Sequence, residues 1–119
     1  MTTETRTPLA ARAADADTTR RVFEALANGS RRTILALLQS GGRYMTSGEI
    51  AGHFDCSWQT ISRHLRVLEE AGLVSFERRG RDRAYTVEAG RLRAVTDQWL
   101  AQFTAKTPRP AAAAVGAAQ

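Results

Sequence analysis

The chain has few of the residues that form disulfides or membrane-spanning segments in many small proteins. Of its 119 residues, one is cysteine and three are proline. A single cysteine excludes an internal disulfide framework. No stretch approaches the roughly 18 consecutive apolar residues that a membrane helix needs, and residues 1–19 lack the apolar segment of a signal peptide. These absences predict a cytoplasmic protein with no membrane partner.

Lysine is almost missing as well, because Lys106 is the only lysine among 17 basic residues. The others are arginines, whose planar guanidinium group matches phosphates and the edges of guanine. With 12 acidic residues, the formal net charge is +5 and the isoelectric point is near 10.6. This balance is typical of nucleic-acid-binding proteins. A GC-rich genome also enriches arginine, so the charge alone leaves the function open.

Sequence motifs of enzymes are absent too. The chain has no G-x-S-x-G segment, no glycine-rich phosphate loop after a strand and no cluster of metal ligands, so we expect neither catalysis nor a cofactor. Alanine supplies 21 of the apolar residues, and a domain with so thin a core often gains stability as a dimer. We expect a disordered arm over 1–16, a folded domain over 17–104 and a disordered Ala/Pro tail over 105–119.

Apolar spacing and capping residues predict a series of helices in the folded domain. The first covers residues 22–26, and Ser30 is the expected N-cap of the second. Thr46 and Glu49 have the spacing of a capping box, which places the start of a third, short helix there. This third helix is expected to end near Asp55.

A fourth helix is predicted after a tight turn of about three residues. Ser57 precedes this helix, and Ile61, Leu65 and Leu68 repeat at the spacing of one buried helical face. Gly72 is placed as a left-handed C-cap. Helices three and four therefore make a helix-turn-helix over residues 47–71, in which Phe54, Cys56 and Ile61 would hold the two helices together.

The periodicity changes after residue 72. Two extended segments flank the polar turn Arg79-Gly80-Arg81-Asp82, which predicts a β-hairpin. A last helix follows over residues 91–103. The predicted fold is mainly α with a small β-hairpin, in the order α-α-α-α-β-β-α, and this arrangement is a winged helix-turn-helix.

The predicted fold places basic side chains where DNA would meet them. A helix fits the major groove of a duplex, and its outward residues meet base edges. We expect the helix over 57–71 to lie in the major groove and the arginine-rich wing over 78–83 to contact the backbone or the minor groove. The expected DNA-binding residues of the helix are Ser57, Trp58, Gln59, Thr60, Ser62, Arg63 and Arg66. Those of the wing are Arg78, Arg79, Arg81 and Arg83.

Two segments carry a resemblance to a known family. LANGSRRTILALL resembles the opening of the ArsR-type winged-helix repressors, and ISRHLRVLEEAGLVSFERRGRDRAYTV resembles their recognition helix and wing. The resemblance covers roughly residues 20–103. It implies a homodimeric bacterial repressor that binds a palindromic operator in double-stranded DNA and regulates its own or a neighbouring operon. The sequence leaves the operator, the regulated genes and the effector open.

The chain departs from the metal-sensing members that it resembles. Thr46, Ser47 and Gly48 stand where those members carry a C-x-C pair. The last helix has no histidine, and Asp97 is its only carboxylate. The resemblance therefore implies the metal-independent branch of the family and no metal site.

The same resemblance implies that dimerisation uses the first and last helices. Both helices carry apolar residues, and those of the last helix form a stripe too large to leave exposed on so small a domain. The expected interface residues are Val22, Phe23, Leu26, Leu92, Val95, Trp99 and Phe103.

Several residues have more than one interpretation. Cys56 is expected to be a small apolar plug of the helix-turn-helix corner; the alternative is a redox- or metal-responsive site with His53. Trp58 either contacts DNA or shields the core. For His64 we expect packing or a phosphate contact rather than pH sensing.

Two further alternatives concern the basic residues and the class of protein. We expect Arg31 and Arg32 to form ion pairs with Glu24 or Glu49 rather than to contact phosphates. The competing class is a winged helix that binds another protein. Such modules tend to lose the outward basic stripe, and its presence here favours DNA.

Overall fold

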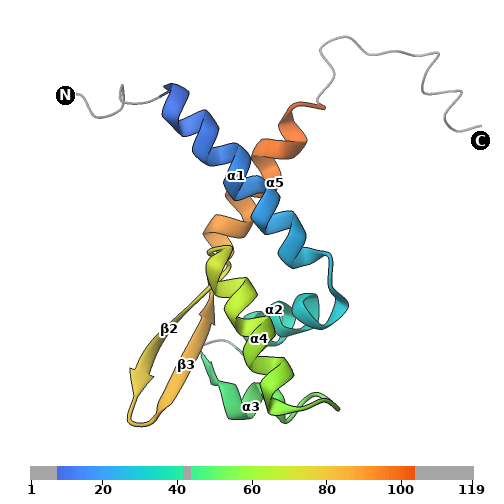
Figure 1. Cartoon of the computed structure of the whole chain (residues 1–119), viewed down its shortest axis with the longest axis vertical. Helices are drawn as coiled ribbons and strands as arrows, with labels where there is room; N and C mark the ends of the chain where they lie inside the picture. The colour runs from blue at the N-terminus through green and yellow to red at the C-terminus, as the bar shows by residue number, and fades with distance from the viewer. Residues whose placement is uncertain (1–7, 42–43, 104–119) are drawn as a thin grey trace, which may run out of the picture.

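The computed structural model describes residues 8–41 and 44–103, and the side chains from Ala16 onward. Figure 1 shows α1 and α5 crossing at one end of the molecule, with the other helices and a β-hairpin below them. The elements are α1 (Pro8–Leu26), α2 (Gly29–Gly41), β1 (Met45–Thr46), α3 (Ser47–Ala51), α4 (Trp58–Glu70), β2 (Val74–Arg79), β3 (Asp82–Val87) and α5 (Ala89–Ala101). The predicted fold class is confirmed. In the part of the chain that the structure describes, no helix is long and apolar enough to cross a membrane.

Helix α1 begins earlier than the sequence pattern predicts. It starts at Pro8, so the expectation of a disordered arm over 1–16 is wrong for residues 8–16; residues 1–7 lie outside the described residues, as does the predicted tail over 105–119. Periodicity fails here because this part of the helix is rich in alanine, whose high helix propensity needs no apolar stripe. Proline is also favoured at the first helical position, where its missing N–H is not needed.

The junction between α1 and α2 is held by side chains that bind backbone groups. The Asn28 side chain accepts a hydrogen bond from the Arg31 N–H (3.0 Å), so Asn28 rather than the predicted Ser30 caps α2. Arg32 donates to the Leu26 carbonyl (2.6 Å), and Arg31 donates to the Ala25 carbonyl (2.8 Å). These arginines therefore donate hydrogen bonds to the last carbonyls of α1. Backbone carbonyls, rather than the predicted carboxylates of Glu24 or Glu49, are their partners.

Helix α3 has the predicted start and an earlier end. The Thr46 hydroxyl accepts from the Glu49 N–H (3.1 Å) while the Glu49 carboxylate accepts from the Thr46 N–H (3.0 Å), which confirms the capping box. The helix ends at Ala51, with Gly52 as its C-cap, rather than near Asp55. The chain then turns tightly through His53, whose N–H bonds the Ile50 carbonyl three residues back (3.0 Å).

Helix α4 is bounded as its sequence predicts. The Ser57 hydroxyl accepts from the Thr60 N–H (3.2 Å) at the N-cap. At the other end, Gly72 has φ 77° and its N–H bonds the Glu69 carbonyl (2.9 Å), while the Leu73 N–H bonds the Leu68 carbonyl (2.9 Å). This pair of bonds is the Schellman motif. It turns the chain directly from α4 into the hairpin.

The sheet contains one strand that the sequence pattern does not reveal. Its order is β1-β3-β2, and β1 pairs with β3 through Met45↔Tyr85 and Thr46↔Ala84. Two residues are too few to show an alternating pattern, so periodicity cannot detect such a strand. The predicted hairpin is present, with Arg79 opposite Asp82 and Gly80 at φ 67° in the two-residue loop. A positive φ is what a tight hairpin turn requires there.

One hydrophobic core joins the helices to the sheet. Ile61, Leu65 and Leu68 form the buried face of α4, as predicted. They pack in one cluster with buried residues of every other described helix, of the sheet and of the connection between α4 and β2. These residues are Val22, Ala25, Ile34, Leu35, Leu38, Ile50, Ala71, Leu73, Val74, Tyr85 and Val95. This core fixes α4 and the base of the hairpin relative to each other.

Candidate nucleic-acid interface

The outward face of α4 begins at a tryptophan. Trp58 is 56% exposed, so of its two interpretations the shielding of the core is wrong. Gln59, Arg63 and Arg66 are exposed as well, and Ser62 is half-buried. Ser57 and Thr60 were also expected to contact DNA, but their hydroxyls bond each other (3.0 Å) within the N-cap of α4. The N-terminal half of α4 therefore presents polar and basic side chains to solvent.

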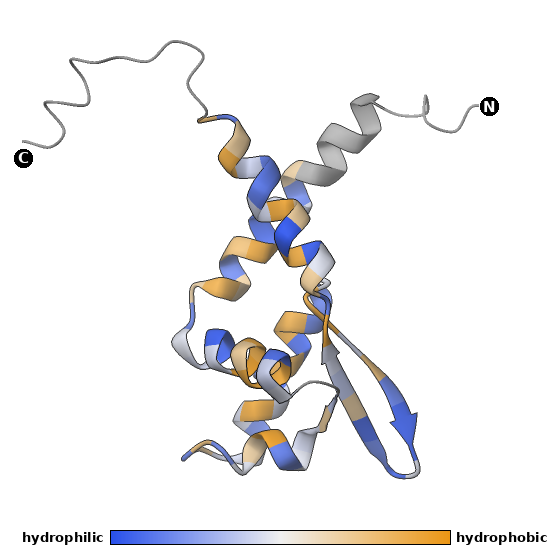
Figure 2. Ribbon diagram, turned by 180° about the vertical axis from the view of Figure 1, so that it is seen from behind, coloured by the Kyte–Doolittle hydropathy of each residue, from blue (hydrophilic) through white to orange (hydrophobic). Residues whose placement is uncertain are grey.

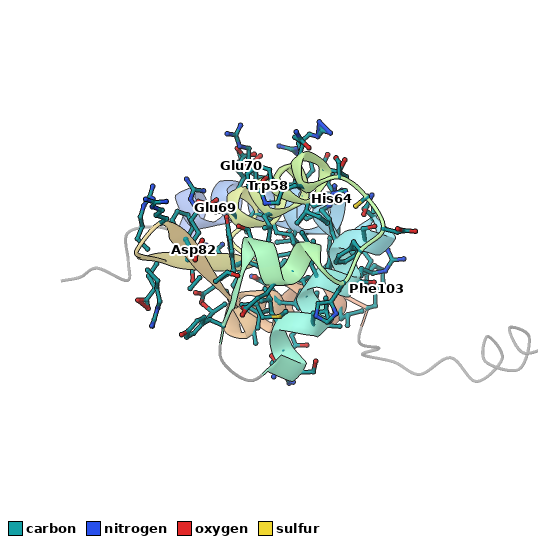
Figure 3. All side chains as sticks on the ribbon, turned by 90° about the horizontal axis from the view of Figure 1, so that it is seen from below. Trp58, His64, Glu69, Glu70, Asp82 and Phe103 are labelled. Carbon is teal, nitrogen blue, oxygen red and sulfur yellow. The ribbon has the colours of Figure 1, made fainter. Side chains whose placement is uncertain are left out.

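A cleft of about 510 Å³ separates α4 from the hairpin. Figure 3 shows Trp58 and Glu69 on the side of α4 nearer Asp82 of the hairpin, and His64 on the other side. The predicted DNA-binding residues in the lining are Trp58, Ser62, Arg66, Arg78, Arg81 and Arg83, and the other lining residues are Ser47, Gly48, Glu69, Asp82 and Tyr85. The lining therefore combines four guanidinium groups with two carboxylates and two aromatic rings, so positive charge exceeds negative charge, as binding to a phosphate backbone requires.

The arginines of the hairpin belong to two groups. Arg83 lies over the Phe76 ring, 4.3 Å from its centroid, and a hydrogen bond to Tyr85 raises the pKa of its guanidinium. Arg79, by contrast, does not line the cleft. Its guanidinium lies 4.3 Å from the centroid of the Tyr44 ring, and its Nη1 donates to the Tyr44 hydroxyl (3.3 Å). Figure 2 shows that the hairpin becomes hydrophilic toward its tip.

His64 faces α2 rather than the cleft. Its Nδ1 lies 3.4 Å from Arg31 Nη1, and Arg31 is also bonded to the end of α1. Burial lowers the pKa of His64, and the charges of Arg31 and Arg63 lower it further. The expected packing role fits these contacts, because the Nδ1 of a neutral imidazole can accept a hydrogen bond from the Arg31 guanidinium.

Comparisons with known proteins agree with this geometry. Residues 13–75 match the model of a family described as Helix-turn-helix domain. The transcriptional repressor SdpR of Bacillus subtilis (strain 168) is 38% identical over 85 residues, which are 71% of this chain and 91% of SdpR. Solved structures of ArsR-family regulators match as well. The chain belongs to the ArsR family of winged helix-turn-helix transcriptional regulators. The predicted family is thereby confirmed, and this ArsR-family protein is a transcriptional regulator.

Solved structures of the family have the same fold. A crystal structure of an ArsR family transcriptional regulator has a TM-score of 0.66 and 29% identity, covering 73% of this chain and 87% of that one. A possible ArsR-family regulator from Mycobacterium bovis has a TM-score of 0.63 and 30% identity, covering 76% of this chain and 83% of that one. Its winged helix-turn-helix DNA-binding domain is described as homodimeric.

The predicted dimer residues of this ArsR-family chain divide between the core and the surface. Val22 is 0% and Val95 8% exposed, so both belong to the core of a single chain and the prediction that they meet a partner is wrong. The reason is that α1 packs against α2, α4 and α5 of the same chain, and Val22 and Val95 belong to one core cluster. Leu26 and Leu92 are partly buried against the same core. The residues that remain exposed are Phe23, Trp99 and Phe103, and Leu100 joins them.

The three aromatic side chains among these residues form a continuous cluster, and Leu100, next to Trp99 in the chain, is exposed as well. The Phe23 and Trp99 rings meet edge to face at 5.2 Å, and the Trp99 and Phe103 rings lie 4.9 Å apart. Trp99 is 40% and Phe103 64% exposed. We call Phe23, Trp99, Leu100 and Phe103 the aromatic cluster. Large apolar side chains gathered at one place on a small domain mark an interaction surface.

Cys56 does not have the position that its sequence context predicts. It is exposed in the turn between α3 and α4, whereas Phe54 is partly buried against the core and Ile61 fully buried. The expectation that Cys56 plugs the corner is therefore wrong. The early end of α3 explains the difference, because the longer turn lets Cys56 face solvent. Within the described ranges, no group of three or more His, Cys, Asp and Glu side chains is placed to hold a metal ion.

Some cleft residues escaped the sequence analysis. Glu69 follows Trp58, Ser62 and Arg66 on one face of the helix, so the helical period could have predicted that it lines the cleft. Tyr85 lies two residues from Arg83 on the same side of β3, which strand alternation predicts. Ser47 and Gly48 lie at the start of α3, which contacts both α4 and β3 and directly follows the strand that pairs with β3. Nothing in the local sequence shows these contacts.

Proposed function

We propose that this regulator represses transcription by binding an operator in double-stranded DNA through α4 and the hairpin. The arginine-lined cleft between these two elements carries the proposal. In this arrangement the N-terminal half of α4 enters the major groove, and the cleft receives the phosphate backbone beside it. The hairpin then follows the backbone or enters the adjacent minor groove.

The two faces of α4 suggest a division of roles. Gln59 and Arg63 are exposed and lie outside the cleft lining, near the helix start that enters the groove. Gln can pair with adenine and Arg with guanine, and each such contact discriminates by about 1–3 kcal/mol. Arg66, Arg78, Arg81 and Arg83 line the cleft and are assigned to phosphates. The charge of a guanidinium is sufficient there, and base identity is not read.

We further infer that the protein acts as a two-fold dimer on a palindromic site. The aromatic cluster supports this inference, because it is exposed on the single chain and its residues lie in α1, in α5 and just after α5. Figure 1 shows these two helices crossing at the other end of the fold from the hairpin tip. The homodimeric M. bovis domain supports it by analogy. A two-fold dimer presents two copies of α4 to two half-sites, which accounts for a palindrome.

Binding of variants to a selected duplex and to a scrambled one tests the assignment. The specific duplex is obtained by selection from a random pool, and both duplexes are titrated across a salt series. Arg63→Ala should weaken binding to the selected duplex by about 1–3 kcal/mol more than to the scrambled one. Arg81→Ala should weaken both similarly and reduce the slope of log K against log salt by about one.

Arg93→Ala is the matched control, since Arg93 is an exposed arginine of α5 that does not line the cleft. It should leave both affinities nearly unchanged. If Arg63→Ala weakened both duplexes equally and Arg81→Ala affected only the selected one, base reading would belong to the hairpin. A wild-type protein that bound no duplex at low salt would instead support the protein-binding alternative.

A further inference from the structure

The tip of the hairpin extends beyond the third strand of the sheet. Strand β1 reaches only Tyr85 and Ala84 of β3, so the pairs Arg78↔Arg83 and Arg79↔Asp82 form a two-stranded ribbon. Two-stranded ribbons have little stability of their own and twist more than wider sheets. The position of the arginines near the tip therefore depends on side-chain contacts with the rest of the domain.

Arg79 makes such a contact. It lies over the Tyr44 ring at 4.3 Å and donates to the Tyr44 hydroxyl at 3.3 Å. Glu77 supports it from the same strand, with Oε1 at 3.8 Å from Arg79 Nη2. Tyr44 directly precedes β1, which leads into the capping box of α3. A cation held over an aromatic ring is attracted to its π-face.

We propose that Arg79 is a positioning residue: with Tyr44 it forms a clasp that fixes the hairpin relative to the helix-turn-helix, and it is not itself a phosphate contact. The geometry supports this role in two ways. The clasp joins residues 35 positions apart in the sequence, and Arg79 is absent from the cleft that Arg78, Arg81 and Arg83 line. A wing held in place before binding loses less conformational freedom on DNA. The proposal rests on the DNA-binding function proposed above and changes the expected role of Arg79.

Salt dependence separates positioning from phosphate contact. A lost phosphate contact reduces the slope of log K against log salt by roughly 0.9 on B-DNA. Arg79→Ala should lower duplex affinity several-fold while reducing the slope by less than half of the change seen with Arg81→Ala, the matched wing control. Tyr44→Ala, which removes no positive charge, should cause the same loss of affinity. The double variant should be no weaker than either single variant.

Conservative variants add a readout that general destabilisation would not produce. Arg79→Lys keeps a cation above the ring and should recover most of the lost affinity. Tyr44→Phe keeps the ring and loses the hydroxyl, so its effect should be intermediate. Thermal unfolding checks that each variant is folded, and Tyr44→Phe keeps the test valid if Tyr44→Ala does not fold.

Hydrogen exchange of the free protein tests the clasp without DNA. The amides of β2 and β3 near the tip should exchange faster in Arg79→Ala and Tyr44→Phe, and at the wild-type rate in Arg81→Ala. Unchanged exchange in both clasp variants would overturn the proposal. A slope reduction by Arg79→Ala equal to that of Arg81→Ala, with no effect of the Tyr44 variants, would also overturn it. If the wild-type protein bound no DNA, the proposed function would be wrong. The exchange rates would still show whether the contact between Arg79 and Tyr44 restrains the hairpin tip.

Discussion

At the scale of single residues, neighbours rather than residue type decide what the arginines do. Arg31 and Arg32 bind the carbonyls that end α1, Arg79 lies on Tyr44, and Arg83 lies over Phe76 in the cleft. Only the last of these side chains is placed toward the proposed DNA surface. The number of arginines in the sequence therefore does not predict the number of phosphate contacts, because guanidinium groups also bind carbonyls and aromatic rings.

His64 should make the stability of the protein depend on pH. Its pKa is lowered by burial and by Arg31 and Arg63, so the unfolded chain takes up the proton before the folded chain does. As the pH falls below the ordinary value of about 6.5, the folded state should therefore lose stability, and above about pH 7.5 the effect should vanish. Urea unfolding of wild type and His64→Gln between pH 5 and 8 measures this difference.

The wild-type free energy of unfolding should decline more steeply toward acid than that of His64→Gln. His53 is present in both proteins and cancels from the comparison. An equal decline would show that His64 titrates as it does in the unfolded chain, and the Arg31–His64 contact would then have no energetic consequence.

At the scale of elements, the end of α4 sets where the wing begins. Gly72 has φ 77°, and its two flanking hydrogen bonds turn the chain into β2. A side chain in this left-handed conformation costs about 1–2 kcal/mol. A Cβ there would also lie 2.7 Å from Arg91 Nε, although that flexible side chain can move away. Gly72→Ala should thus lower the free energy of unfolding by about 1–2 kcal/mol, measured by urea denaturation at fixed protein concentration.

Gly90→Ala is the control for the same chemical change. Gly90 lies within α5, and an added Cβ would meet no atom within 4 Å. Because glycine weakens a helix by roughly 0.5–1 kcal/mol relative to alanine, this variant should be as stable as wild type or slightly more so. An equal loss of unfolding free energy in both variants would show that the positive φ of Gly72 does not cause the destabilisation.

At the scale of the whole molecule, the aromatic cluster belongs to the α1–α5 pair, and the cleft belongs to α4 and the hairpin. Figure 1 shows the crossing of α1 and α5 at the other end of the fold from the hairpin tip. If the cluster joins two chains, then Trp99→Asp should give monomers, because a carboxylate would have to be buried in the apolar interface. Duplex binding should weaken as well, since each monomer reaches one half-site. Light scattering at micromolar concentration and a duplex titration measure the two effects.

Ala94→Asp is the matched control, because it puts the same charge on an exposed position of α5 outside the aromatic cluster. It should remain a dimer and keep its affinity. A wild-type monomer at micromolar concentration would contradict the proposed assembly. A Trp99→Asp dimer would place the interface elsewhere on the chain.

The sequence by itself determined the elements whose signals are local. The apolar face of α4 repeats with the helical period, Ser57 and Gly72 cap that helix, and Gly80 allows the hairpin turn. Local energetics decide these features, so they are visible in a short window of sequence. The segments from Leu26 to Leu38 and from Ile61 to Val87 suggest the family, which the comparisons confirm.

Only the tertiary structure decided features that depend on contacts between distant segments. Val22 is buried in the core, whereas Phe23 beside it lies partly exposed against Trp99 of α5, because neighbouring residues of a helix point in different directions. Strand β1 exists because β3 lies beside it, and Arg79 meets Tyr44 across 35 residues of sequence. Such contacts join residues that are far apart in the sequence, so a short window of sequence does not show them. Burial and partner choice are consequently set by packing, whereas helix ends and turns are set by the residues that form them.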